Sequence, residues 1–178
     1  LHGDGAIDSQ QQLALRIRGE IGNAAGAIRS NGDQHITAGQ IDNRKGVFSS
    51  RGGMEMTAVR LENTDGTGIS QGRGIYRVET LNNRQGKIHS GNTLTLTATH
   101  VGNQAGQLVA TGALALHAAQ LDNSAAGTVS SQDALSVQAE RLNNRDGGLL
   151  LGSGLTTLTV QALDNTAGRL QSAGAMTF

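Results

Sequence analysis

The sequence contains no cysteine, no proline and no tryptophan, and among its 178 residues it has one tyrosine and two phenylalanines. Without cysteine there can be no disulfide, no thiolate nucleophile and no cysteine-based metal site. Because aromatic side chains are so few, small and aliphatic residues must fill the core. Glycine, in contrast, is abundant at 26 residues, which suits tight turns inside a regular hydrogen-bonded framework.

Long apolar runs and an excess of charge are also missing. No stretch is long enough to predict a membrane span, and the first residues lack the basic-then-apolar pattern of a signal peptide. The formal net charge is zero, which argues against a nucleic-acid-binding protein, because such proteins neutralise many phosphates. The charge is unevenly spread, however, since residues 16–87 hold eleven basic and seven acidic residues.

An internal repeat of about 20 residues organises the chain. Asparagine recurs at intervals of 20 or 21 residues, at Asn23, Asn43, Asn63, Asn83, Asn103, Asn123, Asn144 and Asn165. An aliphatic residue lies two positions before each asparagine, and a glycine follows at Gly26, Gly46, Gly66, Gly86, Gly106, Gly127, Gly147 and Gly168. Two residues after the glycine comes another apolar residue, at Ile28, Phe48, Ile88, Leu108, Val129, Leu149 and Leu170. The unit is therefore aliphatic-x-Asn-x-x-Gly.

Each unit also contains alternating segments, as at Leu94, Leu96 and Ala98. Alternation of apolar and polar residues, rich in Leu, Thr and Val, predicts strands. Twenty residues cannot hold strands and a crossover helix, so successive units pair in parallel only if the chain coils. We therefore predict an all-β fold, a parallel β-helix or solenoid with about 20 residues per rung. Residues 1–178 are expected to form a single repeat fragment of a longer rod, with roughly nine rungs and no caps.

Stacking gives each column of like residues a physical role. Equivalent residues of successive rungs lie about 4.8 Å apart, so the aliphatic columns form a continuous core. We expect the asparagines to point inward at a corner, where each amide donates to one neighbouring rung and accepts from the other. We expect the recurrent glycines to provide positive φ where the chain turns.

Three irregularities interrupt this pattern. Gly68 stands where an aliphatic residue is expected, which predicts a bulge or a loosened rung. One residue is inserted between Asn123 and Gly127, and the pattern predicts another insertion near Gly154. Gln34 takes an inward aliphatic place without an evident reason.

No group of residues predicts catalysis, a metal or a cofactor. The histidines, which are His2, His35, His89, His100 and His117, occupy different places in the repeat, so stacking does not gather them as ligands. A recurrent serine, at Ser9, Ser30, Ser50, Ser90 and Ser172, has no partnered histidine and aspartate and indicates a packing or turn feature. Acidic residues before the asparagines, such as Asp42 and Glu62, are expected on a solvated face, because calcium would need more oxygen ligands.

The basic residues suggest the one candidate ligand. Arg44, Lys45, Arg84 and Lys87 belong to a series of basic residues over adjacent rungs that also includes Arg51, Arg60, Arg73 and Arg77. They predict a modest basic patch for sulfated glycans, with a merely solvated surface as the alternative. Neutral sugars are disfavoured because few aromatic rings are available to stack on them.

The segments IDNRKGVFSSRGGMEMTA, LNNRQGKIHSGNTLTLTA and LDNSAAGTVSSQDALSVQAERLNNRDG resemble the haemagglutinin repeats of bacterial two-partner secretion exoproteins. Filamentous haemagglutinin adhesins carry the most similar repeats, and the sticks of contact-dependent growth inhibition toxins are a close second. The resemblance implies a right-handed β-helical shaft, export by an outer-membrane partner transporter, and a place in the medium or on the bacterial cell surface. It predicts the rod-like shaft of an adhesin that attaches to host-cell receptors or glycans. A direct sulfated-glycan-binding module and a toxin stick are the alternatives.

Overall fold

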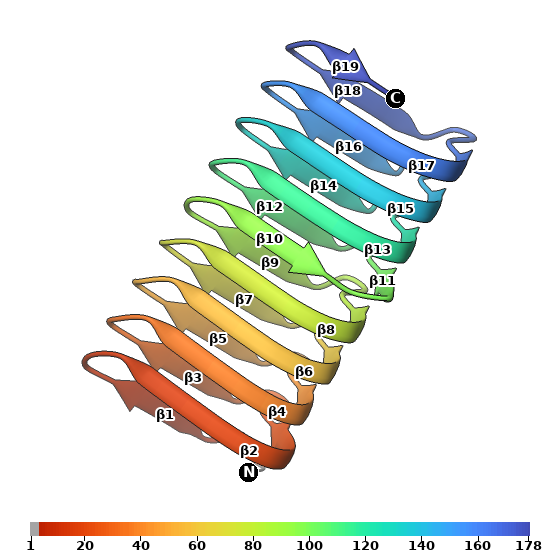
Figure 1. The fold of residues 1–178 in the computed structure, drawn as a ribbon. Coiled ribbons are helices and arrows are strands. Elements are labelled where there is room, and N and C mark those ends of the chain that lie inside the picture. Colours follow the sequence, from red (N-terminus) through yellow and green to blue (C-terminus); the bar gives the residue numbers. More distant parts are fainter. Residues whose placement is uncertain (1–3) are drawn as a thin grey trace.

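A computed structural model describes residues 4–178, in which every regular element is a strand. The chain winds in a right-handed coil whose rungs stack along one axis (Figure 1). Neighbouring strands pair in parallel, with partners 20 or 21 residues apart along nearly the whole chain. The predicted parallel β-helix is therefore confirmed. No transmembrane helix is found in residues 4–178.

Each rung contributes one short and one long strand to two sheets. The short strands form a nine-stranded sheet in the order β1 (Ala6–Ser9), β3 (Ala27–Ser30), β5 (Val47–Ser50), β7 (Thr67–Ser70), β9 (Lys87–Ser90), β12 (Gln107–Ala110), β14 (Thr128–Ser131), β16 (Leu149–Gly152) and β18 (Arg169–Ser172). The long strands form the second sheet from β2 (Leu13–Gly22) through β4 (Gln34–Asp42), β6 (Met54–Glu62), β8 (Gly74–Asn82), β10 (Leu94–Thr97), β13 (Leu114–Asp122), β15 (Leu135–Asn143) and β17 (Thr156–Asp164) to β19 (Met176–Thr177). The break after β10 leaves β11 (His100–Gly102), which pairs with β8 and β13.

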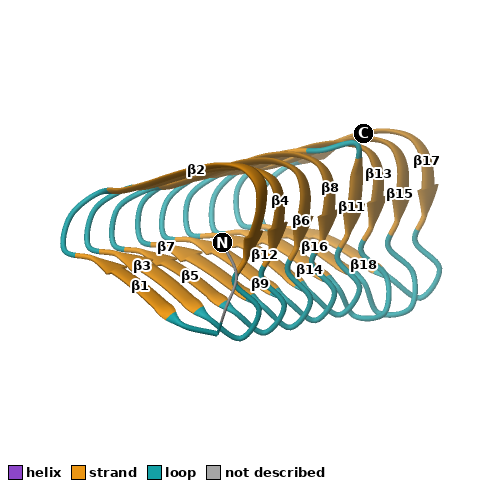
Figure 2. Ribbon diagram, turned by 90° about the horizontal axis from the view of Figure 1, so that it is seen from below, coloured by secondary structure: helices purple, strands orange, loops and turns teal. Residues whose placement is uncertain are grey.

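The long strands bend once, so that each rung has a third face (Figure 2). In β6 the inward and outward alternation is interrupted where Val59 and Arg60 both point outward. The chain then turns a corner, and Leu61 points inward again. The residues after the bend lead directly to the asparagine corner.

The core consists of stacked aliphatic columns. The residues two positions before the asparagines are at most 3% exposed from Ile21 to Leu142, and Phe48 and Leu108 are at most 1% exposed. Burial of each such side chain contributes roughly 1.5–3 kcal/mol.

The prediction of a bulge or a loosened rung at Gly68 is wrong. β7 keeps its register, with Gly68 paired to Phe48 on one side and to Ile88 on the other. The side chain of Tyr76 occupies the space left free, because a Cβ on Gly68 would lie 3.1 Å from the Tyr76 Oη, and one on Gly74 would lie 3.4 Å from its ring. Tyr76 is 2% exposed. A large side chain from β8 in the opposite sheet thus replaces the missing aliphatic residue, and the strand stays regular.

The buried phenol of Tyr76 predicts a fall in stability at alkaline pH. Its hydroxyl donates to Met54 Sδ at 3.2 Å, and burial raises the pKa of Tyr76 well above its usual range. In the unfolded chain the phenol titrates near pH 10. Above about pH 10 the unfolded chain therefore loses a proton that the folded chain keeps, and the free energy of unfolding falls by about 1.4 kcal/mol per pH unit. Urea unfolding from pH 9 to 11 measures this slope. Tyr76→Phe should remove the part of the slope that comes from the phenol. An equal slope in the wild type and in Tyr76→Phe would contradict this assignment.

The second one-residue insertion does not lie near Gly154. Val129 of β14 pairs with Leu150 of β16, so the extra residue lies in the turn before β16. Leu150 is therefore the buried residue, at 0% exposure, and Leu149, predicted to be inward, faces outward.

Gln34, also 0% exposed, donates through Nε2 to the carbonyl oxygens of Ile28 and Ser49, both at 3.1 Å. These bonds satisfy the amide nitrogen of this inward polar side chain, whereas its buried Oε1 has no hydrogen-bond partner among the described residues.

Candidate functional site

The eight asparagines line one corner of the coil and are joined by hydrogen bonds. From Asn23 to Asn144, the Nδ2 of each donates to the Oδ1 of the asparagine one rung further, at 2.6–2.8 Å, and the last of these seven bonds reaches Asn165. From Asn23 to Asn144 these side chains are at most 3% exposed. Each amide therefore donates and accepts in a dry environment, where an unmade hydrogen bond costs about 1–3 kcal/mol.

The same amides also bind the backbone of the corner. Asn103 Nδ2 donates to the Gly106 carbonyl in its own rung at 3.2 Å and to the Thr128 carbonyl in the next rung at 3.1 Å. The backbone of Asn103 donates to the Asp122 carbonyl at 2.7 Å and accepts from Gly106 N at 3.0 Å. One side chain thus satisfies backbone groups of two rungs where the chain leaves one sheet and enters the other.

The glycine column has a different cause from the one predicted. Within residues 4–178, only Gly147 among the glycines has positive φ, at 81°. In most rungs the residue before the glycine adopts it instead, as at Ala25, Lys45, Asp65, Gln85, Ala105 and Ala167. Glycine is needed because two rungs approach closely: a Cβ on Gly46, Gly66, Gly86, Gly106, Gly127 or Gly168 would lie 1.9–2.3 Å from an asparagine carbonyl oxygen of the preceding rung. At the first corner, Gly26 N donates to the Asn23 carbonyl at 3.0 Å.

Gly147 does not belong to this close-approach column, contrary to the prediction. Gly148 takes that place, since a Cβ there would lie 2.5 Å from the Asn123 carbonyl oxygen. Gly147 and Asp146, with φ of 81° and 54°, accommodate the inserted residue. The other corner with an insertion uses Ala125 and Ala126 in the same way, with φ of 52° and 63°.

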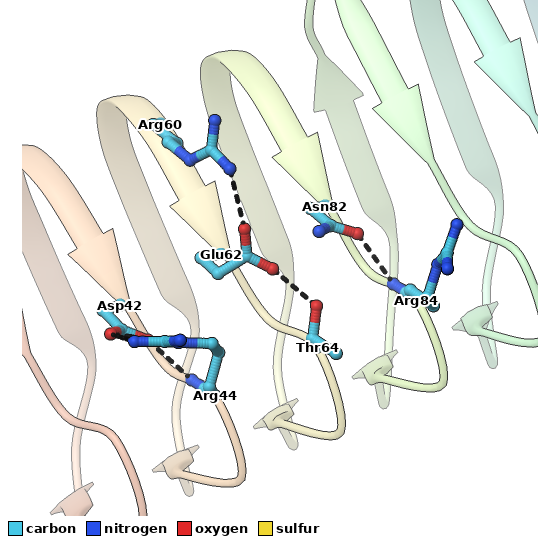
Figure 3. A network of polar contacts seen from close by, with 7 residues as sticks. All are labelled: Asp42, Arg44, Arg60, Glu62, Thr64, Asn82 and Arg84. Atoms are coloured by element: carbon cyan, nitrogen blue, oxygen red, sulfur yellow. Dashed lines mark hydrogen bonds and ion pairs between the residues drawn. The ribbon is translucent and has the colours of Figure 1, made fainter.

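A second polar column, predicted to be a solvated face, closes the corner from outside. Through Oδ1, each of five residues accepts a hydrogen bond from the backbone N–H two residues further on, at 3.0–3.3 Å; these are Asp42, Asn82, Asp122, Asn143 and Asp164. Glu62, whose side chain is longer, accepts from Thr64 Oγ1 at 2.5 Å. Figure 3 shows three of these residues on successive rungs. The signal that could have revealed this column is the short acidic or amide residue directly before the corner asparagine, since such residues favour turns of this kind.

Ion pairs border the same corner. Arg44 binds Asp42 with two nitrogens, Nε to Oδ1 at 2.9 Å and Nη2 to Oδ2 at 2.6 Å. This hydrogen bonding from Arg44 lowers the pKa of Asp42. Arg60 pairs with Glu62 at 2.9 Å. Shallow recesses of about 290 Å³ beside Asp42 and about 300 Å³ beside Asp122 lie on this third face.

The four basic residues of the predicted glycan patch are not brought into one cluster. Arg44 and Arg84 take the same place in rungs that are separated by the rung of Thr64 (Figure 3). The charge of Arg44 is compensated by Asp42. Lys45 lies in the turn, and Lys87 begins β9. In the part of the chain that the structure describes, no ion pair is seen at Lys45, Arg84 or Lys87.

The other polar residues considered from the sequence have local roles. The hydroxyls of Ser50 and Ser90 each donate to a turn carbonyl of the preceding rung at 2.7 Å. His117 Nδ1 lies 3.1 Å from Gln138 Oε1, and His2 lies outside the described residues. Among residues 4–178, no three His, Asp or Glu side chains converge to hold a metal ion.

A coil of parallel rungs with polar ladders at its corner defines a β-helical repeat protein. The model of the haemagglutinin repeat family matches residues 1–73, 69–139 and 109–178, which together span the chain. The chain therefore belongs to the haemagglutinin repeat family, as its resemblance to those repeats predicted. No curated protein and no solved structure matches it.

Proposed function

We propose that the chain is part of the rod-like shaft of a secreted or surface-exposed bacterial adhesin that mediates attachment to host cells. The observation that carries this proposal is the regular stack itself, with nine parallel strands in one sheet and insertions of one residue at most. Such a coil extends along its axis by about 4.8 Å per rung, so the segment provides roughly 40 Å of length. Its regularity suits a spacer that carries distant binding regions.

Export by an outer-membrane partner transporter belongs to the same proposal. Family membership supports it, and so does the absence of cysteine, because disulfides would obstruct passage in an unfolded state. Each folded rung presents parallel edges on which the next can form.

Removal of whole rungs tests the proposal. Deletion of residues 44–103 joins Asn43 to Gln104 and removes three rungs in register. In bacteria that produce the natural full-length protein, we expect a shaft shorter by about 14 Å, unchanged surface display and retained attachment to host cells. Electron microscopy measures the shaft, and a cell-binding assay measures attachment.

A matched deletion of residues 44–93 removes two and a half rungs and is expected to abolish display, because it brings unlike columns together. If bacteria that lack the whole protein attached equally well to host cells, the proposed role in adhesion would be refuted. Loss of attachment after the three-rung deletion, with display unchanged, would show that these rungs bind the receptor directly.

Direct binding of sulfated glycans is the second candidate, supported by Lys45, Arg84 and Lys87, which carry no ion pair among the described residues. It predicts retention on immobilised heparin at physiological salt, and at least about a tenfold loss of affinity when Arg44, Lys45, Arg84 and Lys87 become Ala. No retention at physiological salt would exclude it. A toxin stick instead predicts contact-dependent killing of neighbouring bacteria.

A further inference from the structure

The outward side of the nine-stranded sheet, named here the short-strand face, carries recurrent aliphatic side chains and few charges of its own. Each strand from β3 to β18 directs its first and third residues outward. Partly exposed aliphatic side chains recur there, at Val47, Ile69, Val109, Leu149 and Leu151. Over the same strands the outward charges are Arg29, Lys87 and Arg169, and Arg29 is paired with Asp8 at 3.5 Å.

Before the bend, the outward side of the long strands carries a similar number of charges, at Arg16, Glu55 and Arg77, and Arg77 and Glu55 form an ion pair with each other. Its aliphatic content is different, because threonine and other polar residues take most of its outward places and Ile75 is the one aliphatic side chain larger than alanine there in strands β2 to β17. Burial of aliphatic surface drives association. The short-strand face therefore gains more than the opposite face when a partner covers it.

From this contrast we propose that two copies of the chain associate side by side through their short-strand faces, with their axes pointing in the same direction. The inference is independent of whether the shaft belongs to an adhesin or to a toxin. It concerns how shafts associate with one another, not what their distant parts bind.

The repeat explains why a second copy is the partner. The face presents the same two columns on nine consecutive strands about 4.8 Å apart, and only a surface with the same spacing can interdigitate with it along its whole length. Facing sheets pack about 10 Å apart. Nine strands of four residues cover about 43 Å by 13 Å, or roughly 550 Å² per copy. This reaches the roughly 1,000 Å² of total buried area that a specific interface requires.

The side chains favour the parallel arrangement of the two axes. A two-fold axis along the rods places each strand opposite its own copy and the first outward column opposite the third. Leu149 then faces Leu151 of the second copy, and Lys87 faces His89. With the axes opposed, Lys87 would face Lys87 of the second copy at the centre, and Arg29 would face Leu151. Like charges and a charge against an aliphatic side chain both oppose that arrangement.

Chemical crosslinking tests this geometry, because the chain has no cysteine of its own. Leu151→Cys is expected to give a dimer with a short bismaleimide. Thr159→Cys, which is outward on the opposite sheet of the same rung, is expected to stay monomeric. A mixture of Arg29→Cys and Leu151→Cys chains should give no mixed dimer. A mixed dimer would mean opposed axes and would overturn the proposal.

Sedimentation provides a second, independent readout. The double substitution Val109→Lys with Leu151→Lys should weaken dimerisation by at least about tenfold, while Thr97→Lys with Thr159→Lys should not change it. Circular dichroism and urea unfolding of each variant show whether it is folded. A folded wild-type chain that stays monomeric, or a dimer that the first pair leaves unchanged, would overturn the proposal. Association end to end would also overturn it, since that contact leaves both lysine pairs without effect.

Discussion

Gly106→Ala is expected to destabilise the coil by about 3–5 kcal/mol, a loss typical of a severe steric conflict. The new Cβ would lie 2.1 Å from the Asn83 carbonyl oxygen and 2.6 Å from Asn103 Oδ1. One of these atoms is backbone and the other belongs to the asparagine ladder, so neither can move away without separating two rungs. Relief of the clash therefore breaks hydrogen bonds at the corner.

Gly19→Ala is the matched control, because a Cβ there meets no atom within 4 Å. That substitution should be neutral or slightly stabilising, since alanine reduces the freedom of the unfolded chain. Urea unfolding compares the two variants, and the fluorescence of the single tyrosine, Tyr76, reports on the rung before Gly86. Equal unfolding midpoints would mean that close approach is not the reason for the glycine column.

The parts of the fold that could be predicted are those in which equivalent residues of successive rungs have the same surroundings. In a parallel coil, each residue stacks on its equivalent one rung away, so columns of Leu, Ile and Val show the core directly. The single-residue insertions were harder to place. At Gly147 and Gly148 two adjacent glycines fit the same pattern, and contacts with the preceding rung, such as the pairing of Val129 with Leu150, are needed to distinguish them.

The features that escaped prediction depend on atoms of another rung or another sheet. The sequence shows a glycine at 106, but its cause is the Asn83 carbonyl oxygen that faces it. Positive φ is adopted by residues as different as Ala25, Lys45 and Gln85, so composition gives no sign of it. Similarly, nothing in the repeat indicates that Tyr76 of one sheet compensates for Gly68 of the other.

Substitution of a ladder asparagine is the second change with a large expected effect. Asn103→Ala removes the bond that Asn103 donates to Asn123 Oδ1 at 2.7 Å and the one that it accepts from Asn83 Nδ2 at 2.7 Å. It also leaves the Gly106 and Thr128 carbonyl oxygens without this donor. Because each orphaned buried group costs about 1–3 kcal/mol and Asn83 keeps other partners, we expect a loss of about 3 kcal/mol.

Asn143→Ala, in the outer polar column, is the control for this loss. Its Nδ2 donates to Asp122 Oδ1 at 3.1 Å and its Oδ1 accepts from Arg145 N at 3.3 Å, but water can replace these bonds because the side chain is only partly buried. We expect a loss below about 1 kcal/mol. Urea unfolding measures both variants, and equal losses would mean that burial of the ladder adds nothing to its strength.

Asn103→Asp separates hydrogen-bond chemistry from side-chain size, because the two side chains have nearly the same shape. The carboxylate can still accept from Asn83, but it has no donor for Asn123 Oδ1 or the Thr128 carbonyl, and its charge is buried at a position that is 0% exposed. Burial raises the pKa of the introduced carboxyl in the folded chain. As the pH rises above about 4, the unfolded chain releases this proton first, so the stability of Asn103→Asp relative to the wild type should fall. At lower pH the protonated carboxyl donates one bond and part of the loss should be recovered. A deficit independent of pH between 3 and 7 would indicate that the corner requires only the shape of asparagine, not its alternating donors and acceptors.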